Sequence, residues 1–396
     1  MPLSMPHGWL RPSVLLLSLL ASAVHADVYT GTLGSLPIVV DLDLTNPDQV
    51  TGRYFYEKYH RDLALSGTLA NDQLTLNEGL DDNSDTPRPQ LTLAHQPDDS
   101  WQGSWSKPNG KPLKVVLKAA QVPDAPAGAD PIWTQLHDND PYDFLRLLQL
   151  PLVNGKRDSF MGYPLQWRGE PNAKIEMFEV ESGYPEPQLS RINQALRTRL
   201  LTEVVSYHEC MLGSTRFGDG EYDQTVTPTF LSPAVVSVSV ATSYYCGGAH
   251  PDFGDAPINF DVSHGKPLSL EDVLWVGDGA AFHYDDREGA QQSEEADVDF
   301  DKFSSYRDKT LAPWLVQQFT QLYPNEMKKP KDENDCDYSD PGVWNFPTWH
   351  FTDKGIAFGP GFARAARMCE GTDWSVLPYS VIAQHPGGVK LALPAN

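Results

Sequence analysis

The most distinctive candidate for a functional site in the sequence is a predicted strand followed directly by two glycines and a histidine. It reads Tyr-Tyr-Cys-Gly-Gly-Ala-His-Pro over residues 244–251. Paired glycines adopt backbone angles that other residues avoid, and they let a ligand approach the backbone closely. His250 could therefore face a ligand at the end of the strand. Its ring could also cap the turn by bonding backbone carbonyls, and we favour this structural role.

No motif of a known catalytic or cofactor site accompanies this string. The sequence contains no Gly-x-Ser-x-Gly, His-Glu-x-x-His, phosphate-binding loop or dinucleotide-binding glycine pattern. The run from Asp297 to Asp301 resembles the start of a calcium loop, but Lys302 stands where such a loop needs glycine. We therefore expect a solvated acidic loop, no metal and no cofactor. Catalytic carboxylate pairs cannot be recognised among 53 acidic residues, so a cell-wall or glycan hydrolase remains an alternative.

The first 26 residues have the pattern of a secretory signal peptide. Arg11 precedes a short apolar core over residues 14–20, and small residues precede a cleavage point after Ala26. The apolar core is shorter than the roughly 20 residues that a membrane span needs. We expect a soluble periplasmic or secreted protein with no membrane insertion.

Four cysteines follow this segment, at Cys210, Cys246, Cys336 and Cys369. An even number of cysteines in an exported chain predicts disulfides. Of the three possible pairings we favour Cys210–Cys246 with Cys336–Cys369, because each bond then joins neighbours along the chain.

The charge balance excludes two classes of partner. The chain has 30 Lys and Arg against 53 Asp and Glu, a formal charge of −23. Nucleic acids and anionic lipids are bound by clusters of Lys and Arg, so we expect neither as a partner. The acidity either attracts a basic protein or only keeps an exported protein soluble, and both interpretations stand.

Short alternating strands separated by polar turns predict an all-β domain over residues 27–120. Eight such runs favour a meander that closes as a barrel or a curved sheet. Its large aromatic residues have two interpretations: they pack the β core, or they line a cleft that carries a small or glycan ligand. The residues concerned are Tyr54, Tyr56, Trp101 and Trp105.

A proline-rich linker over 121–131 separates this domain from an α+β domain over 132–396. Helical spacing predicts a long helix over 187–212 and a second over 304–323. Strands are expected between them, and the mixture indicates helices packed on an antiparallel sheet. The other expected elements are a short helix over 140–148, a capped helix over 269–274, and strands over 159–168, 174–180, 225–231, 235–245, 258–262, 345–358 and 376–382.

Four segments of the second region resemble a domain found at the C-terminus of the RsiV anti-sigma factor and in the PdaC peptidoglycan deacetylase. They agree in order and spacing over residues 160–385. The segments are Tyr184-Pro with Ile192-Asn193, Tyr245-Cys-Gly-Gly-Ala-His250, Asn259 to Leu274, and Phe358-Gly-Pro-Gly-Phe362 followed by Gly371 and Leu377-Pro-Tyr-Ser380.

The resemblance implies an α+β accessory or sensing domain with no catalysis of its own. In the RsiV anti-sigma factor this domain binds lysozyme through a loop that here carries Gly359, Pro360, Gly361 and Phe362. Our leading hypothesis is therefore a non-catalytic binding protein that engages a basic, lysozyme-like cell-wall hydrolase through this loop, with Tyr245 and His250 as further binding residues. The chain departs from the family pattern because Phe362 replaces a tyrosine.

Overall fold

The computed structural model describes residues 27–79, 87–126, 128–216, 218–284, 299–332 and 335–394. The predicted signal peptide lies outside these ranges, as do positions 297 and 298 of the acidic run. Asp299, from the same run, caps a helix by accepting a hydrogen bond from the Lys302 backbone N–H at 2.8 Å. Among the helices of the described ranges, none has both the length and the apolar character that a membrane crossing needs.

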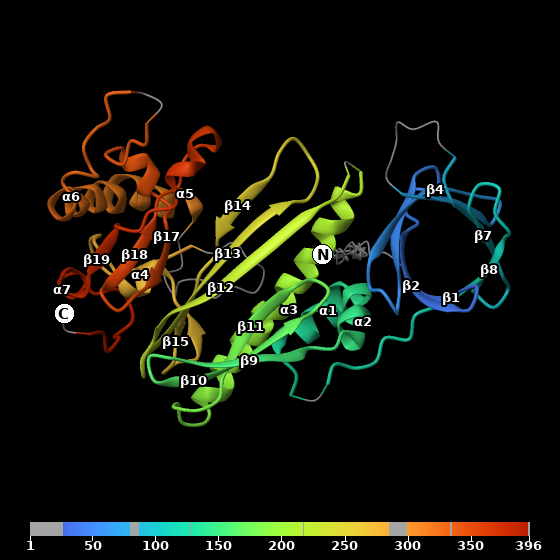
Figure 1. The fold of residues 1–396 in the computed structure, drawn as a ribbon, viewed down its shortest axis with the longest axis horizontal. Coiled ribbons are helices and arrows are strands. Elements are labelled where there is room, and N and C mark those ends of the chain that lie inside the picture. The colour runs from blue at the N-terminus through green and yellow to red at the C-terminus, as the bar shows by residue number, and fades with distance from the viewer. Residues whose placement is uncertain are drawn as a thin grey trace, which may run out of the picture.

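A closed antiparallel barrel occupies one end of the molecule, and the C-terminal sheet lies at the other (Figure 1). Each barrel strand pairs with the next, and the last closes on the first. Of the two predicted forms of the meander, the barrel is therefore correct. Its strands are β1 (Asp27–Leu33), β2 (Leu36–Asp43), β3 (Val50–Tyr56), β4 (Asp62–Ala70), β5 (Gln73–Glu78), β6 (Gln90–His95), β7 (Trp101–Ser106) and β8 (Leu113–Ala119).

Apolar side chains fill the interior of this barrel. Tyr54 and Trp101 are 1% and 5% exposed, so both belong to the core rather than to a ligand cleft. Trp105 is half-buried, and its indole N–H donates to Glu78 Oε2 at 2.9 Å, as the Tyr54 hydroxyl does at 2.6 Å. The edge of the Tyr56 ring meets Tyr54 with centroids 5.5 Å apart. The aromatic residues thus pack the barrel, as the first interpretation predicts.

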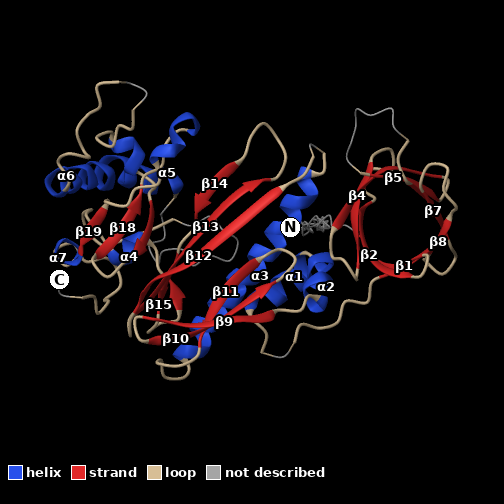
Figure 2. Ribbon diagram, viewed as in Figure 1, coloured by secondary structure: helices blue, strands red, loops and turns tan. Residues whose placement is uncertain are grey.

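The second domain begins with two helices, α1 (Pro131–Asn139) and α2 (Pro141–Gln149), and continues into two antiparallel sheets crossed by the long helix α3 (Gln188–Ser214). Figure 2 shows these helices against the strands, which is the predicted α+β arrangement. The buried stripe of α3 contains Ile192, Leu196, Leu200 and Val204. The strands are β9 (Val153–Phe160), β10 (Tyr163–Glu170), β11 (Ile175–Val180), β12 (Glu221–Leu231), β13 (Val235–Tyr245), β14 (Asp252–Asp255), β15 (Ile258–Asp261) and β16 (Lys266–Pro267).

A small C-terminal sheet packs with short helices around Trp344, Phe319 and Phe351, which are fully buried. Ser269 caps α4 (Leu270–Val273) as predicted, and it forms a capping box with Asp272. The remaining elements are α5 (Phe300–Tyr306), a π-helical turn η1 (Arg307–Leu311), α6 (Ala312–Leu322), 3₁₀ turns η2 (Pro341–Trp344) and η3 (Arg364–Cys369), strands β17 (Thr348–Phe351), β18 (Gly355–Gly359) and β19 (Val376–Pro378), and α7 (Tyr379–Ile382).

Three predicted elements are wrong in detail. The strand expected over 159–168 is a hairpin, because the chain turns at Met161 and Gly162, both with positive φ. The helix over 304–323 contains the π-helical turn, next to Pro313, which lacks a backbone N–H to donate. The strand over 376–382 stops at Pro378 and continues as α7.

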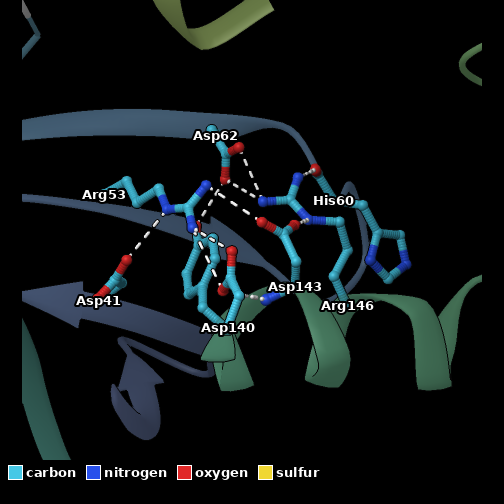
Figure 3. Close-up of polar contacts among 8 residues, drawn as sticks. Asp41, Arg53, His60, Asp62, Asp140, Asp143 and Arg146 are labelled. Carbon is cyan, nitrogen blue, oxygen red and sulfur yellow. Dashed lines mark hydrogen bonds and ion pairs between the residues drawn. The ribbon is translucent and has the colours of Figure 1, made fainter. Parts of the chain in front are cut away.

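The barrel is joined to the second domain through α2, and the contact contains buried charges (Figure 3). Arg146, fully buried on α2, pairs with Asp62 of β4 and with Asp143 one turn earlier on α2, each at 2.7 Å. The Tyr142 hydroxyl donates to Asp62 at 2.6 Å. The guanidinium of Arg146 also lies over the Phe55 ring, 4.7 Å from its centroid.

A second arginine extends this network along the barrel wall. Arg53 of β3 pairs with Asp41, Asp140 and Asp143 at 3.1, 3.1 and 3.2 Å. Burial raises the pKa of the Asp143 carboxyl, although both arginines oppose that shift. Four aspartates and two arginines therefore meet where the barrel contacts α2.

We expect buried His208 of α3 to make the protein sensitive to acid. Burial, with Arg146 and His60 nearby, lowers the pKa of His208 to about 2. An unfolded histidine titrates near pH 6.5, so below that pH the unfolded chain binds one more proton than the folded chain. Stability from this group falls by about 1.4 kcal/mol per pH unit as pH drops.

Urea unfolding at about pH 7.5 and about pH 5.5 measures this effect. The loss of stability on acidification should be about 1.4 kcal/mol smaller in His208→Gln than in the wild type, because one pH unit below 6.5 is crossed. The raised pKa of Asp143 makes the folded chain more stable as pH falls, which opposes the effect of His208. This contribution is the same in the wild type and in His208→Gln. Parallel pH dependence in the two proteins would contradict the assignment.

Candidate functional site

Two segments far apart in the sequence meet at the end of the β13–β14 hairpin. One is residues 247–253, which contain the glycine pair and His250, and the other is residues 361–370, which follow β18. We call them together the two-loop surface. Arg364 donates to the His250 ring, and Arg367 donates to the Asp252 carboxylate and to the Phe253 carbonyl. The structure therefore brings the two predicted binding segments together.

A disulfide fixes each of these segments. Cys246, directly before the glycine pair, is bonded to Cys210 of α3, and Cys369 is bonded to Cys336. This is the pairing that chain proximity favours. Bonds inside the second segment add to the constraint: Glu370 accepts from the Phe362 N–H at 2.9 Å and pairs with Arg367 at 3.2 Å. Both loops are therefore held in shape without a partner.

The side chains that this frame leaves exposed are large and apolar. Met368 is 84% exposed, the highest value among the large hydrophobic residues of the described chain, and Phe253 is 43% exposed. The Arg367 guanidinium lies 4.7 Å from the centroid of the Phe253 ring. Arg367 pairs with both Asp252 and Glu370, and Arg364 contacts the His250 ring, so the surface combines apolar side chains with a polar rim.

The Gly-Gly-Ala-His string takes the form that its glycines predict. Gly247 and Gly248 have φ of 90° and 113°, values that L side chains rarely adopt. The Tyr245 hydroxyl donates to the Gly248 carbonyl at 3.0 Å and so braces the turn. The exposed His250 ring lies 3.1 Å from the Pro251 carbonyl and accepts from Arg364. His250 thus contacts the second segment through Arg364.

The loop of Gly359, Pro360, Gly361 and Phe362, which we expect to bind a partner, is only partly exposed. Pro360 is buried, and Phe362 is half-buried with its ring edge-on to Tyr338 at 5.5 Å. A Cβ at Gly359 would meet the Thr348 hydroxyl at 2.3 Å, so Gly359 serves internal packing. Only Gly361 faces open space. Pro360 and Phe362 therefore support the loop, and the side chains offered to a partner lie elsewhere on it.

Sequence reasoning missed the residues that this surface exposes. Met368, Arg364 and Arg367 lie on η3, and Phe253 lies on the short strand β14. No pattern in the run Arg-Ala-Ala-Arg-Met-Cys shows which of its side chains are exposed, so the sequence contains no signal for this surface. Within the part of the chain that the structure describes, no three His, Cys, Asp or Glu side chains come together as a metal site would require.

Comparisons with known proteins place few constraints on this surface. No family model matches the chain, and no curated protein matches it. Among solved structures, the crystal structure of a member of the DUF3298 family from Bacteroides fragilis aligns with 60% of this chain and 92% of its own. The aligned residues are 13% identical and the TM-score is 0.36. A TM-score this low does not show a common fold.

Proposed function

We propose that the protein is an exported, non-catalytic binding protein that engages a basic protein through the two-loop surface. The observation that carries this proposal is the exposure of Met368 and Phe253 on loops that two disulfides already hold in shape. Loops fixed before binding lose little conformational entropy when a partner docks. Methionine, aromatic residues and arginine are also the residue types enriched where proteins meet.

The charge of the chain supports a basic partner. At −23 the protein attracts cationic proteins over long range, and such fields raise association rates more than they deepen affinity. The two disulfides fit an oxidising compartment, where secreted cell-wall hydrolases act. A lysozyme-like hydrolase, which the family resemblance also suggests, is therefore the partner that we would test first.

Replacing Met368 with alanine should weaken this complex strongly. A well-buried apolar anchor at an interface centre contributes about 2 kcal/mol, which corresponds to roughly a 30-fold rise in Kd. Calorimetry of the chain lacking residues 1–26 with lysozyme measures this change. Met161→Ala is the matched control, because Met161 is 46% exposed and lies on the β9–β10 turn. The control should bind like the wild type.

Two results would contradict the proposal at different points. Absence of measurable heat with lysozyme and with other basic hydrolases would reject the partner class. Equal affinities for Met368→Ala and Met161→Ala would reject the two-loop surface. Raising the salt concentration should lower the association rate steeply, because salt screens the long-range field. The increase in dissociation rate caused by Met368→Ala should stay the same at every salt concentration.

A further inference from the structure

A cleft lies between α3 and the sheet formed by β12, β13 and β14, on the face of β13 opposite Phe253. Its volume is about 530 Å³, within the range of small-molecule sites. Figure 1 shows α3 beside these strands. We call it the α3 cleft. It is lined by Arg199, Glu203, Ser206, Glu209 and Cys210 of the helix, and by Tyr222, Val240, Thr242, Tyr244, Cys246, Gly254, Asp255 and Ala256 of the sheet side.

The cleft exists because small residues form part of its floor. Thr242 pairs with Gly254 across the sheet, while Tyr222 pairs with Tyr244 in the neighbouring row. A Cβ placed on Gly254 would meet no atom within 4 Å. The two tyrosine rings stack with centroids 6.3 Å apart, and they form the aromatic end of the floor.

The polar groups of the cleft are held in place before any ligand arrives. Glu203 is nearly buried and accepts from Arg199 at 2.5 Å, from the Tyr222 hydroxyl at 2.8 Å and from the Gln224 amide at 2.7 Å. The Cys210–Cys246 disulfide joins the helix wall to the strand wall. The disulfide therefore tethers the two walls to each other at this point of the cleft.

The charge of the lining selects a cation. Two carboxylates, those of Glu203 and Glu209, line the cleft against one guanidinium, that of Arg199, while the Asp255 carboxylate accepts from the Ser239 hydroxyl on the other face of β13. The chain as a whole adds a field of −23, which concentrates cations and repels anions. Tyrosine rings attract an ammonium group through their faces and pack against its aliphatic chain.

We propose that the α3 cleft binds a primary ammonium group carried on a linear aliphatic chain. The ammonium pairs with the carboxylates of Glu209 and Glu203, and the aliphatic chain lies over the tyrosine rings and the open space above Gly254. This site is distinct from the two-loop surface, and it does not depend on the partner proposed there.

Titration with cadaverine, a linear diamine, tests the site by calorimetry. We expect saturable binding at one site, and no binding of pentanediol or glutarate, which have the same chain length without the ammonium groups. Gly254→Val fills the open space in an unstrained strand position, and it should weaken cadaverine binding at least about tenfold. Glu209→Gln should act in the same direction because it removes a charge from the lining.

Two control variants match these changes elsewhere in the chain. Gly361→Val makes the same substitution on the two-loop surface, and Asp48→Asn removes one charge from an exposed barrel turn. Both should bind cadaverine like the wild type. Near-ultraviolet circular dichroism and thermal unfolding verify that every variant is folded.

The proposal is overturned if cadaverine does not bind, if pentanediol binds equally well, or if Gly254→Val has wild-type affinity. It is also overturned if Asp48→Asn weakens binding as much as Glu209→Gln, because the attraction would then be diffuse. A free amine and a lysine side chain both carry the required group. If lysozyme displaces bound cadaverine, a partner's lysine occupies the cleft, and if it does not, the ligand is the free amine.

Discussion

Replacing Arg146 with methionine is expected to lower the free energy of unfolding by about 3–5 kcal/mol. Methionine conserves much of the volume of arginine, so packing against Phe55 is largely kept. The variant takes from Asp62 the arginine that pairs with it, while Asp143 keeps its pair with Arg53 at 3.2 Å, and a buried charge that loses its partner is among the most costly defects in a protein interior.

The exposed pair between Arg157 and Glu181 provides the control for this prediction. Arg157 is 75% exposed, and its ion pair spans 3.1 Å. Exposed pairs contribute at most about 1 kcal/mol, so Arg157→Met should shift the urea midpoint little. If Arg146→Met and Arg157→Met unfold at similar urea concentrations, the buried network does not hold the barrel to α2.

Removing the Cys210–Cys246 disulfide should cost about 3–4 kcal/mol of stability, because the bond closes a 36-residue loop in the unfolded chain. The double variant Cys210→Ala, Cys246→Ala keeps two small side chains at the bonded positions. We expect it also to weaken both proposed binding activities, since Cys246 borders the glycine turn and lines the α3 cleft.

The second disulfide serves as a companion measurement. Cys336→Ala with Cys369→Ala should lower stability by a similar amount, because its loop spans 33 residues. It should loosen the Met368 segment and leave cadaverine binding in place. Peptide mapping without reduction checks the pairing itself. Free thiols in the folded chain, or an unfolding free energy lowered by less than about 1 kcal/mol, would contradict the prediction.

Local patterns in the sequence were sufficient for the eight-stranded meander and for the long helix, whereas the pairing of β1 with β8 decided that the meander closes as a barrel. Alternating residues with polar turns define a strand and its neighbour at once, because hairpin partners are adjacent in the chain. The helix over 187–212 was predictable because Ile192, Leu196, Leu200 and Val204 share one face. Chain proximity likewise predicted both disulfides, and the glycine pair predicted a turn with unusual backbone angles.

Long-range contacts decided what these elements do. Arg364 meets His250 across 114 residues, and Arg146 meets Asp62 across 84. No periodicity encodes such pairs, because an arginine in a sequence has the same pattern whether it is exposed or buried. Exposure was equally undecided: Pro360 is buried and Met368 is exposed, although both lie in the segment that follows β18. Gly254 leaves open space on its strand, but this space became one side of a cleft only because α3 lies across the sheet there and supplies the other wall.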